Sequence, residues 1–249
     1  MRPTLLDIVR AVGHDVRATL DGELGPQSLD DLVDEVYGLA GTLVERLRPP
    51  QKPARKLPVC RAGCDSCCRV HAVFVTPAEA LRIASHLRAT RSTSEIKRLR
   101  KRIETLCGRV AEMSVEDRAR AAVPCPLLDE KTGNCTVHPV RPLLCRGYNS
   151  YDAAVCDRQC AKGDLSIVPP FDSVQARAYK HVFAGLVLGA GPRRVSGPLE
   201  LIHAMRAALA SADVEERWLS GEPVFDATET RIGREKAPEW YAFLEAEQL

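Results

Sequence analysis

Long apolar runs are missing from the sequence. The first twenty residues, MRPTLLDIVRAVGHDVRATL, break up their apolar side chains with Asp7, Arg10, His14, Asp15 and Arg17. They therefore lack the continuous apolar core of a secretory signal peptide. No segment approaches the ~20 apolar residues that a membrane-spanning helix needs. We expect a cytoplasmic protein with reduced thiols and no membrane partner.

An excess of charge of one sign is also missing. The formal net charge is +2 at pH 7, too small by itself to indicate binding to nucleic acid or membrane. The most basic stretch, residues 82–109, holds nine Lys or Arg against Glu95 and Glu104, without an aromatic residue among them on which a base could stack. We favour a solvated helix face here over a nucleic-acid or acidic partner.

Glycine-rich turns between a strand and a helix, which hold dinucleotide cofactors, are absent from the sequence as well. Gly189-Ala190-Gly191 follows a helical pattern and predicts a helix end. The sequence therefore contains no motif that names an enzymatic reaction, and whether the protein is an enzyme is left open.

The prevailing pattern is helical. Apolar residues recur at helical spacing in residues 5–20 and 32–47, and Thr4 and Ser28 are candidate N-caps. Thr76-Pro77-Ala78-Glu79 predicts a strong helix start after a short β-favouring run at 70–75, and Ser92 or Thr93 begins the next helix. Further helices are expected at 172–188, 199–210, 214–219 and 238–247.

These patterns predict a mainly α fold, in which a helical scaffold surrounds a cysteine-rich, loop-heavy metal-binding module with a short β-hairpin. We expect four segments. They are an N-terminal helical hairpin at 1–48, a Pro-rich connector at 49–59, the cysteine module at 60–165, and C-terminal helices packed on the module at 166–249.

Nine of the ten cysteines fall into two groups, Cys60, Cys64, Cys67 and Cys68, then Cys125, Cys135, Cys145, Cys156 and Cys160. Ten in 249 residues is well short of the roughly 8–10% that marks a small disulfide scaffold. Thiols clustered in this way are typical of zinc or iron–sulfur sites, so we take all nine as candidate ligands. Cys107 stands apart on a helix and is expected to be buried.

Two geometries remain open for residues 60–68. A helix would put the sulfurs on one side, whereas an irregular segment near Gly63 would turn Cys67 and Cys68 apart. In the second group, residues 127–137 predict a hairpin turning at Gly133-Asn134, which would bring Cys125 and Cys135 to the same end. Pro142 predicts a helical turn carrying Cys145.

Arg141 and Arg146 flank Cys145. Four thiolates around a divalent ion leave net negative charge, which these guanidinium groups would compensate. The alternative is that both are surface arginines paired with carboxylates.

Three segments together, Cys60-x3-Cys64-Asp-Ser-Cys67-Cys68, Cys125-Pro-Leu-Leu and Arg141-Pro142-Leu-Leu-Cys145-Arg146-Gly-Tyr148, resemble the YkgJ family of cysteine-cluster proteins. The resemblance implies a zinc- or iron-chelating domain over about residues 60–160. His138 stands where that family often has Tyr, and it is either a nitrogen ligand or a histidine supporting the site.

The resemblance implies a metal without implying a reaction. We therefore expect a non-catalytic metalloprotein, or a metal- or redox-responsive module with a protein partner. Flagellin lysine methylases carry a similar cysteine cluster, so an iron–sulfur-dependent enzyme acting on a protein or small molecule is the alternative. An open coordination position lined by His138, Arg141, Arg146 or Tyr148 would favour that alternative.

Overall fold

The computed structural model describes residues 4–22, 28–48, 57–190, 198–225 and 242–243. The helices are α1 (Leu5–Asp21), α2 (Ser28–Leu47), α3 (Ser66–Val70), α4 (Pro77–Thr90), α5 (Thr93–Val110), α6 (Val115–Arg120), α7 (Leu143–Gly147), α8 (Ala153–Lys162), α9 (Ser173–Gly189), α10 (Leu201–Ala208) and α11 (Val214–Leu219), with a 3-10 turn at His138–Val140. The strands are β1 (Phe74–Val75), β2 (Leu128–Asp129), β3 (Asn134–Cys135) and β4 (Leu199–Glu200). The predicted mainly α fold is confirmed for this part of the chain.

Capping boxes start the helices where the sequence predicted them. Thr4 caps α1, with its hydroxyl accepting from the backbone N–H of Asp7 at 3.1 Å, and Thr76 and Ser92 cap α4 and α5 in the same way. Because each box satisfies backbone donors from within one turn, these starts depend on local sequence alone. The helix expected near Ser28 begins at that residue.

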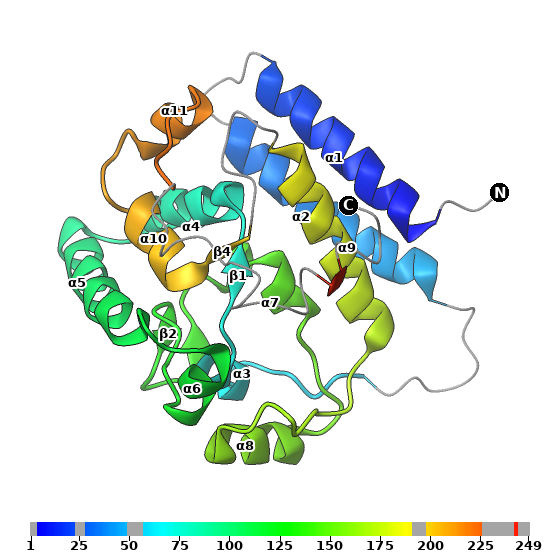
Figure 1. Ribbon diagram of the computed structural model, residues 1–249, viewed down its shortest axis with the longest axis vertical. Helices are drawn as coiled ribbons and strands as arrows, with labels where there is room; N and C mark the ends of the chain where they lie inside the picture. Colours follow the sequence, from blue (N-terminus) through cyan, green and yellow to red (C-terminus); the bar gives the residue numbers. More distant parts are fainter. Residues whose placement is uncertain (1–3, 23–27, 49–56, 191–197, 226–241, 244–249) are drawn as a thin grey trace.

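The two N-terminal helices and α9 (Ser173–Gly189) form one helical layer. Helices α1 and α2 pack along α9, as Figure 1 shows for the blue and yellow-green helices. A Cβ on Gly185 of α9 would lie 2.6 Å from the Cβ of Val12, so the glycine allows the close approach of α1. The core of this layer includes Val9, Val33 and Phe183, all fully buried.

A second layer combines α4, α5 and α10 with the antiparallel pair β1–β4, in which Val75 lies opposite Leu199. The sequence predicted a single helix over 199–210, but the backbone of residues 199–200 pairs with β1 instead. The side chain of Glu200 then caps α10 by accepting from the N–H of His203 at 3.0 Å. Glu200 also forms a buried ion pair with Arg118 at 2.8 Å.

A buried carboxylate, Glu79, joins the two layers. It accepts from the N–H groups of Thr76 at 2.9 Å and Leu143 at 2.8 Å, and the hydroxyl of Tyr37 donates to it at 3.5 Å. Burial raises the pKa of Glu79, while these hydrogen bonds lower it. The sequence identified Glu79 as a capping residue only.

Part of the basic stretch at 82–109 is tied into the fold. Arg82 pairs with Asp34 at 2.8 Å, and Arg88 donates to the carbonyls of Ala208 and Ser211. Arg102 reaches the hairpin β2–β3, donating to the carbonyl of Leu128 at 3.0 Å. The expectation of a simply solvated face therefore misses three arginines that hold neighbouring segments in place.

Several sequence expectations have a different outcome or lie outside the described residues. Helices α6 and α8 were not predicted, and Val70 ends α3 where a strand was expected. Most of the expected helix at 238–247 and most of the connector at 49–59 lie outside the described residues. Among the described residues, none of the helices combines the length and apolarity required to traverse a bilayer.

Candidate metal centre

The first cysteine segment is irregular, followed by a short helix. Cys60 follows Val59, whose N–H donates to the carbonyl of Ser150 at 2.8 Å, and the chain then turns at Gly63 with φ of 79°. Helix α3 starts after Asp65, so Cys67 and Cys68 lie in its first turn while Cys60 and Cys64 precede it. The structure thus combines the two geometries that the sequence left open, because residues 60–65 are irregular while Cys67 and Cys68 lie in a helix with a hydrogen bond between their side chains.

The predicted hairpin is present as β2 and β3, with Leu128 opposite Cys135. The N–H of Cys125 donates to the carbonyl of Cys68 at 2.8 Å, which ties the hairpin to α3. The N–H of Gly63 donates to the side chain of Asn134 at 2.9 Å, which ties the hairpin turn to the first cysteine segment. The two cysteine groups are therefore adjacent.

Helix α7 carries Cys145 and begins after Pro142, as predicted. Its first N–H, on Leu143, is held by the buried carboxylate of Glu79. This contact anchors Cys145 to the helical scaffold rather than to the loops around it.

Helix α8 carries Cys156 and Cys160 four residues apart, on one face. The carboxylate of Asp152 caps it by accepting from the N–H groups of Ala154 and Val155, and Gly163 ends it with φ of 58°. It packs against α3, and the hydroxyl of Ser66 donates to Asp157 at 2.8 Å. Asp152 and Gly163 were the cap signals by which this helix could have been predicted.

The thiols influence one another electrostatically. Burial raises the pKa of Cys64, and the nearby Cys67, Cys60 and Cys156 raise it further. Burial also raises the pKa of Cys145 well above its ordinary value, and Cys125, Cys67 and Cys135 add to this shift. Cys67 and Cys60 each act on members of both groups, Cys67 on Cys64 and Cys145, and Cys60 on Cys64 and Cys156.

The remaining pKa shifts have the same main cause. Burial raises the pKa of Cys125 to about 12 and also raises the pKa of Cys135, Cys156 and Cys160. For Cys67, a hydrogen bond with Cys68 is the largest cause of a strongly raised pKa, followed by burial. These thiols therefore keep their protons at neutral pH unless a metal ion displaces them.

The two arginines beside Cys145 lie in different surroundings. The positive charge of Arg141 lowers the pKa of Cys67, Cys135 and Cys145. Its Nε is buried with no hydrogen-bond partner in the described part of the chain. The guanidinium of Arg146 lies 4.4 Å from the centre of the Tyr37 ring and donates to the carbonyls of Pro139 and Arg141.

His138 and Tyr148 lie toward solvent. His138 is exposed, and its pKa is lowered by partial burial and by the charges of Arg141 and Arg146. Tyr148 stacks on His71 with the ring centres 4.7 Å apart. Sequence reasoning missed His71, whose pKa is lowered by burial and raised by a hydrogen bond with Gln159.

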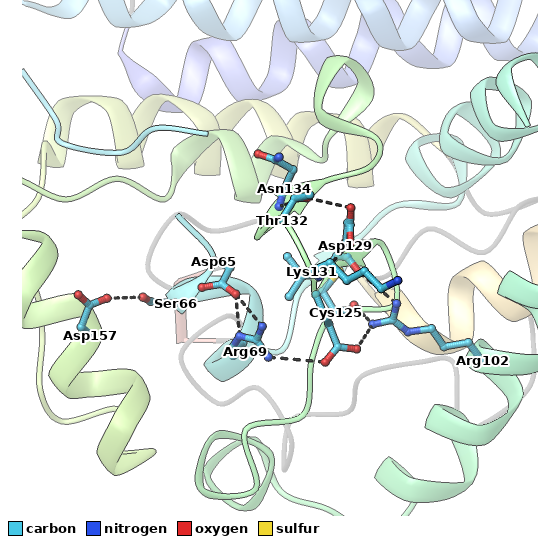
Figure 2. Close-up of polar contacts among 12 residues, drawn as sticks. Asp65, Ser66, Arg69, Arg102, Cys125, Asp129, Lys131, Thr132, Asn134 and Asp157 are labelled. Atoms are coloured by element: carbon cyan, nitrogen blue, oxygen red, sulfur yellow. Dashed lines mark hydrogen bonds and ion pairs between the residues drawn. The ribbon is translucent and has the colours of Figure 1, made fainter. Parts of the chain in front are cut away.

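A chain of charged residues also runs beside the cysteines (Figure 2). Arg69 of α3 pairs with Asp65 at 2.7 Å and approaches Glu130 at 3.7 Å, and Glu130 pairs with Arg102 at 2.8 Å. Arg102 also donates to the carbonyl of Cys125 at 3.3 Å. This chain links α3, the hairpin turn and α5, and no local sequence motif predicts it.

The donor set suits a thiophilic metal. Nine cysteines come from four segments. The first segment contacts α8 and the hairpin, and Cys145 of α7 is an electrostatic neighbour of Cys67, Cys125 and Cys135. Sulfur ligands in this number favour zinc or iron–sulfur chemistry over hard cations. Within the described residues, however, no three His, Cys, Asp or Glu side chains already have the arrangement that would hold a metal ion. The thiols are gathered in one region but do not form a closed site.

Comparison with known proteins supports this assignment over the middle of the chain. Residues 59–161 match the family model CxxCxxCC, described as "Putative zinc- or iron-chelating domain". The name of the model has two residues between its first and second cysteines, whereas three residues separate Cys60 from Cys64 in this chain. No curated protein and no solved structure matches the chain. The match supports metal chelation, while the narrower assignment to the YkgJ family stays a prediction.

Proposed function

We propose that the protein binds zinc or iron, the latter as an iron–sulfur cluster, through thiolates from the nine clustered cysteines. The observation that carries this proposal is that the first cysteine segment contacts both the hairpin, through the hydrogen bonds Cys125–Cys68 and Gly63–Asn134, and helix α8, which packs on α3. The segments belong to the same region that matches a chelating domain. Arg141 would compensate part of the negative charge of the bound thiolates.

In this proposal, metal binding and folding of the cysteine module are coupled. Metal binding would displace the thiol protons and draw the sulfurs together, which couples the binding energy to folding. For a zinc site closed by four thiolates, apparent values are on the order of 10 kcal/mol. The metal would then hold the loop-rich module together, because that module contains few regular elements of its own.

We further propose a non-catalytic role in the cytoplasm, in which a protein partner responds to the metal or redox state of the site. An enzyme would need an open position lined by His138, Arg141, Arg146 or Tyr148. Of these, only Arg141 exerts its charge on the thiols, since Arg146 lies over Tyr37 and Tyr148 stacks on His71. The iron–sulfur-dependent enzyme is therefore the second candidate.

Anaerobic purification followed by metal analysis and a visible absorption spectrum tests the proposal. A colourless protein with stoichiometric zinc would identify a zinc site, and a brown protein with iron and acid-labile sulfide would identify a cluster. Protein that contains neither metal after anaerobic purification, and binds neither on reconstitution, would refute metal binding.

Two matched cysteine variants test the assignment of ligands. Cys145→Ser should lower both the metal content and the melting temperature, because Cys145 belongs to the cluster. Cys107→Ser should leave the metal content unchanged, because Cys107 is buried on α5 and lies apart from the cluster. Loss of metal from Cys107→Ser would show that the grouping is wrong.

A further inference from the structure

The clustered thiols lie in two different environments. Cys125, Cys135 and Cys145, here called the inner group, all pack against the hydrophobic core. Their chain neighbours Leu127, Val137 and Leu143 are almost fully buried. The inner group thus rests on the same packed side chains that hold the helical layers together.

Cys60, Cys64, Cys156 and Cys160, here called the outer group, come from segments that present exposed residues to solvent. Cys60 is exposed, and so are the three residues that follow it, 61–63. In α8, Gln159 is the one buried residue, while Asp157 and Arg158 next to Cys156 are exposed. None of these four cysteines is among the residues that pack on the core.

The two groups are also attached to the scaffold differently. The inner group is held by the Glu79 contact to Leu143, by the Arg102 contacts to the carbonyls of Leu128 and Cys125, and by the pairing of β2 with β3. Interactions that join the outer group to the rest of the module include single hydrogen bonds from Val59, Gly63 and Ser66. Segments with few buried apolar contacts open more readily than the core does.

Several thiols within each group are electrostatic neighbours. Cys64 is influenced by Cys60 and Cys156, and Cys145 is influenced by Cys125 and Cys135. Cys67 and Cys68, in the first turn of α3, lie between the two groups. The cluster therefore has enough sulfur on each side for a separate metal position.

Building on the proposed function, we propose that the cluster holds metal at two positions of unequal lability. Metal on the inner group is structural, because the core shields it and fixes its ligands. Metal on the outer group is exchangeable, because a competing ligand can approach α8 and residues 60–63 from solvent and local opening frees the sulfurs. The outer position is the one that a metal-accepting molecule, or an oxidant, would reach.

Chelator competition tests this inference in the intact, metal-loaded protein under reducing, anaerobic conditions. Release is followed with pyridylazoresorcinol if the metal is zinc, or with ferrozine if it is iron. Wild-type protein should release metal in a fast and a slow phase. Cys156→Ser should lose the fast phase and keep the slow phase and the far-ultraviolet circular dichroism spectrum. Cys107→Ser should retain both phases.

The inner variant gives the complementary result. Cys135→Ser should lose the slow phase and lower the melting temperature. If that variant does not fold, the wild type and Cys156→Ser still decide the question.

A single phase in the wild type, or loss of all metal together with the fold in Cys156→Ser, would overturn the two-position inference while leaving metal binding intact. Absence of any bound metal in the wild type would instead refute the proposed function, and this inference with it.

Discussion

Replacing Gly133 with Ala tests how the two cysteine groups are held together. Gly133 lies in the hairpin turn with φ of 70°, and its backbone faces the first cysteine segment. A Cβ at this position would lie 2.7 Å from the carbonyl oxygen of Gly63. The substitution therefore introduces backbone strain and also pushes the segment of Cys60 and Cys64 away from the hairpin.

The expected cost follows from these two effects. A non-glycine residue in the left-handed region costs about 1–2 kcal/mol. Losing the hydrogen bond from Gly63 to Asn134, which is 2.9 Å long, adds about 1 kcal/mol. We expect Gly133→Ala to lower the free energy of unfolding of the metal-depleted protein by roughly 2–3 kcal/mol. It should also weaken metal binding, because Cys64 and Cys135 move apart.

Gly38→Ala is the matched control. Gly38 lies within α2, and an added Cβ there would meet no atom within 4 Å. Alanine should raise the free energy of unfolding by about 0.5–1 kcal/mol, because glycine in a helix is entropically unfavourable. Urea unfolding and metal titration of both variants provide the measurements. A Gly133→Ala protein as stable as the wild type, with unchanged metal affinity, would refute the contact between the hairpin turn and the first cysteine segment.

Three further substitutions test the contacts that support the site. Burial raises the pKa of Glu79, so the contribution of this group to stability is full below its unfolded pKa and falls as pH rises through its folded pKa. Glu79→Gln should remove this part of the pH dependence. If urea unfolding at several pH values gives the same change of unfolding free energy with pH in the wild type and in the variant, the reasoning is wrong. Arg118→Met leaves Glu200 buried without its partner at 2.8 Å and should lower the free energy of unfolding by about 3–5 kcal/mol. Adding Glu200→Gln as a second substitution should recover part of this loss. An unchanged stability of Arg118→Met in thermal unfolding would show that the pair is not buried in solution. Arg102→Ala removes hydrogen bonds to the carbonyls of Leu128 and Cys125 and should lower the free energy of unfolding by about 1.5–3 kcal/mol. Lys101→Ala, at an exposed position of the same helix, should change it by less than about 0.5 kcal/mol. Equal denaturation midpoints for the two variants would show that Arg102 does not anchor the hairpin.

Local sequence was sufficient for much of the helical scaffold. Thr4, Thr76 and Ser92 each start a helix by a capping box that closes within one turn, so no distant contact is needed to predict them. The hairpin was predictable for the same reason, because Gly133 supplies the positive φ of its turn. The cysteine spacing, which belongs to the sequence alone, indicated a thiophilic metal.

Distant contacts decided the elements that the sequence misassigned. Residues 199–200 continue a helical pattern, yet they form β4 because β1 offers unpaired backbone groups. Arg102 belongs to a basic stretch in the sequence, but in the fold it donates to the carbonyl of Leu128 in the hairpin. Such partners are 26 residues away or more, and periodicity within one segment contains no information about them.

The candidate site shows the same division. Residue type and spacing by themselves determined that nine thiols are available and that they favour zinc or iron. The tertiary structure decided which thiols are neighbours, and it packed Cys125, Cys135 and Cys145 against the core but not Cys60 and Cys156. The physical reason is that burial is a property of the packed helical layers, which determine how far water and competing ligands reach each sulfur, whereas the cysteine pattern specifies only the chemistry of the ligands.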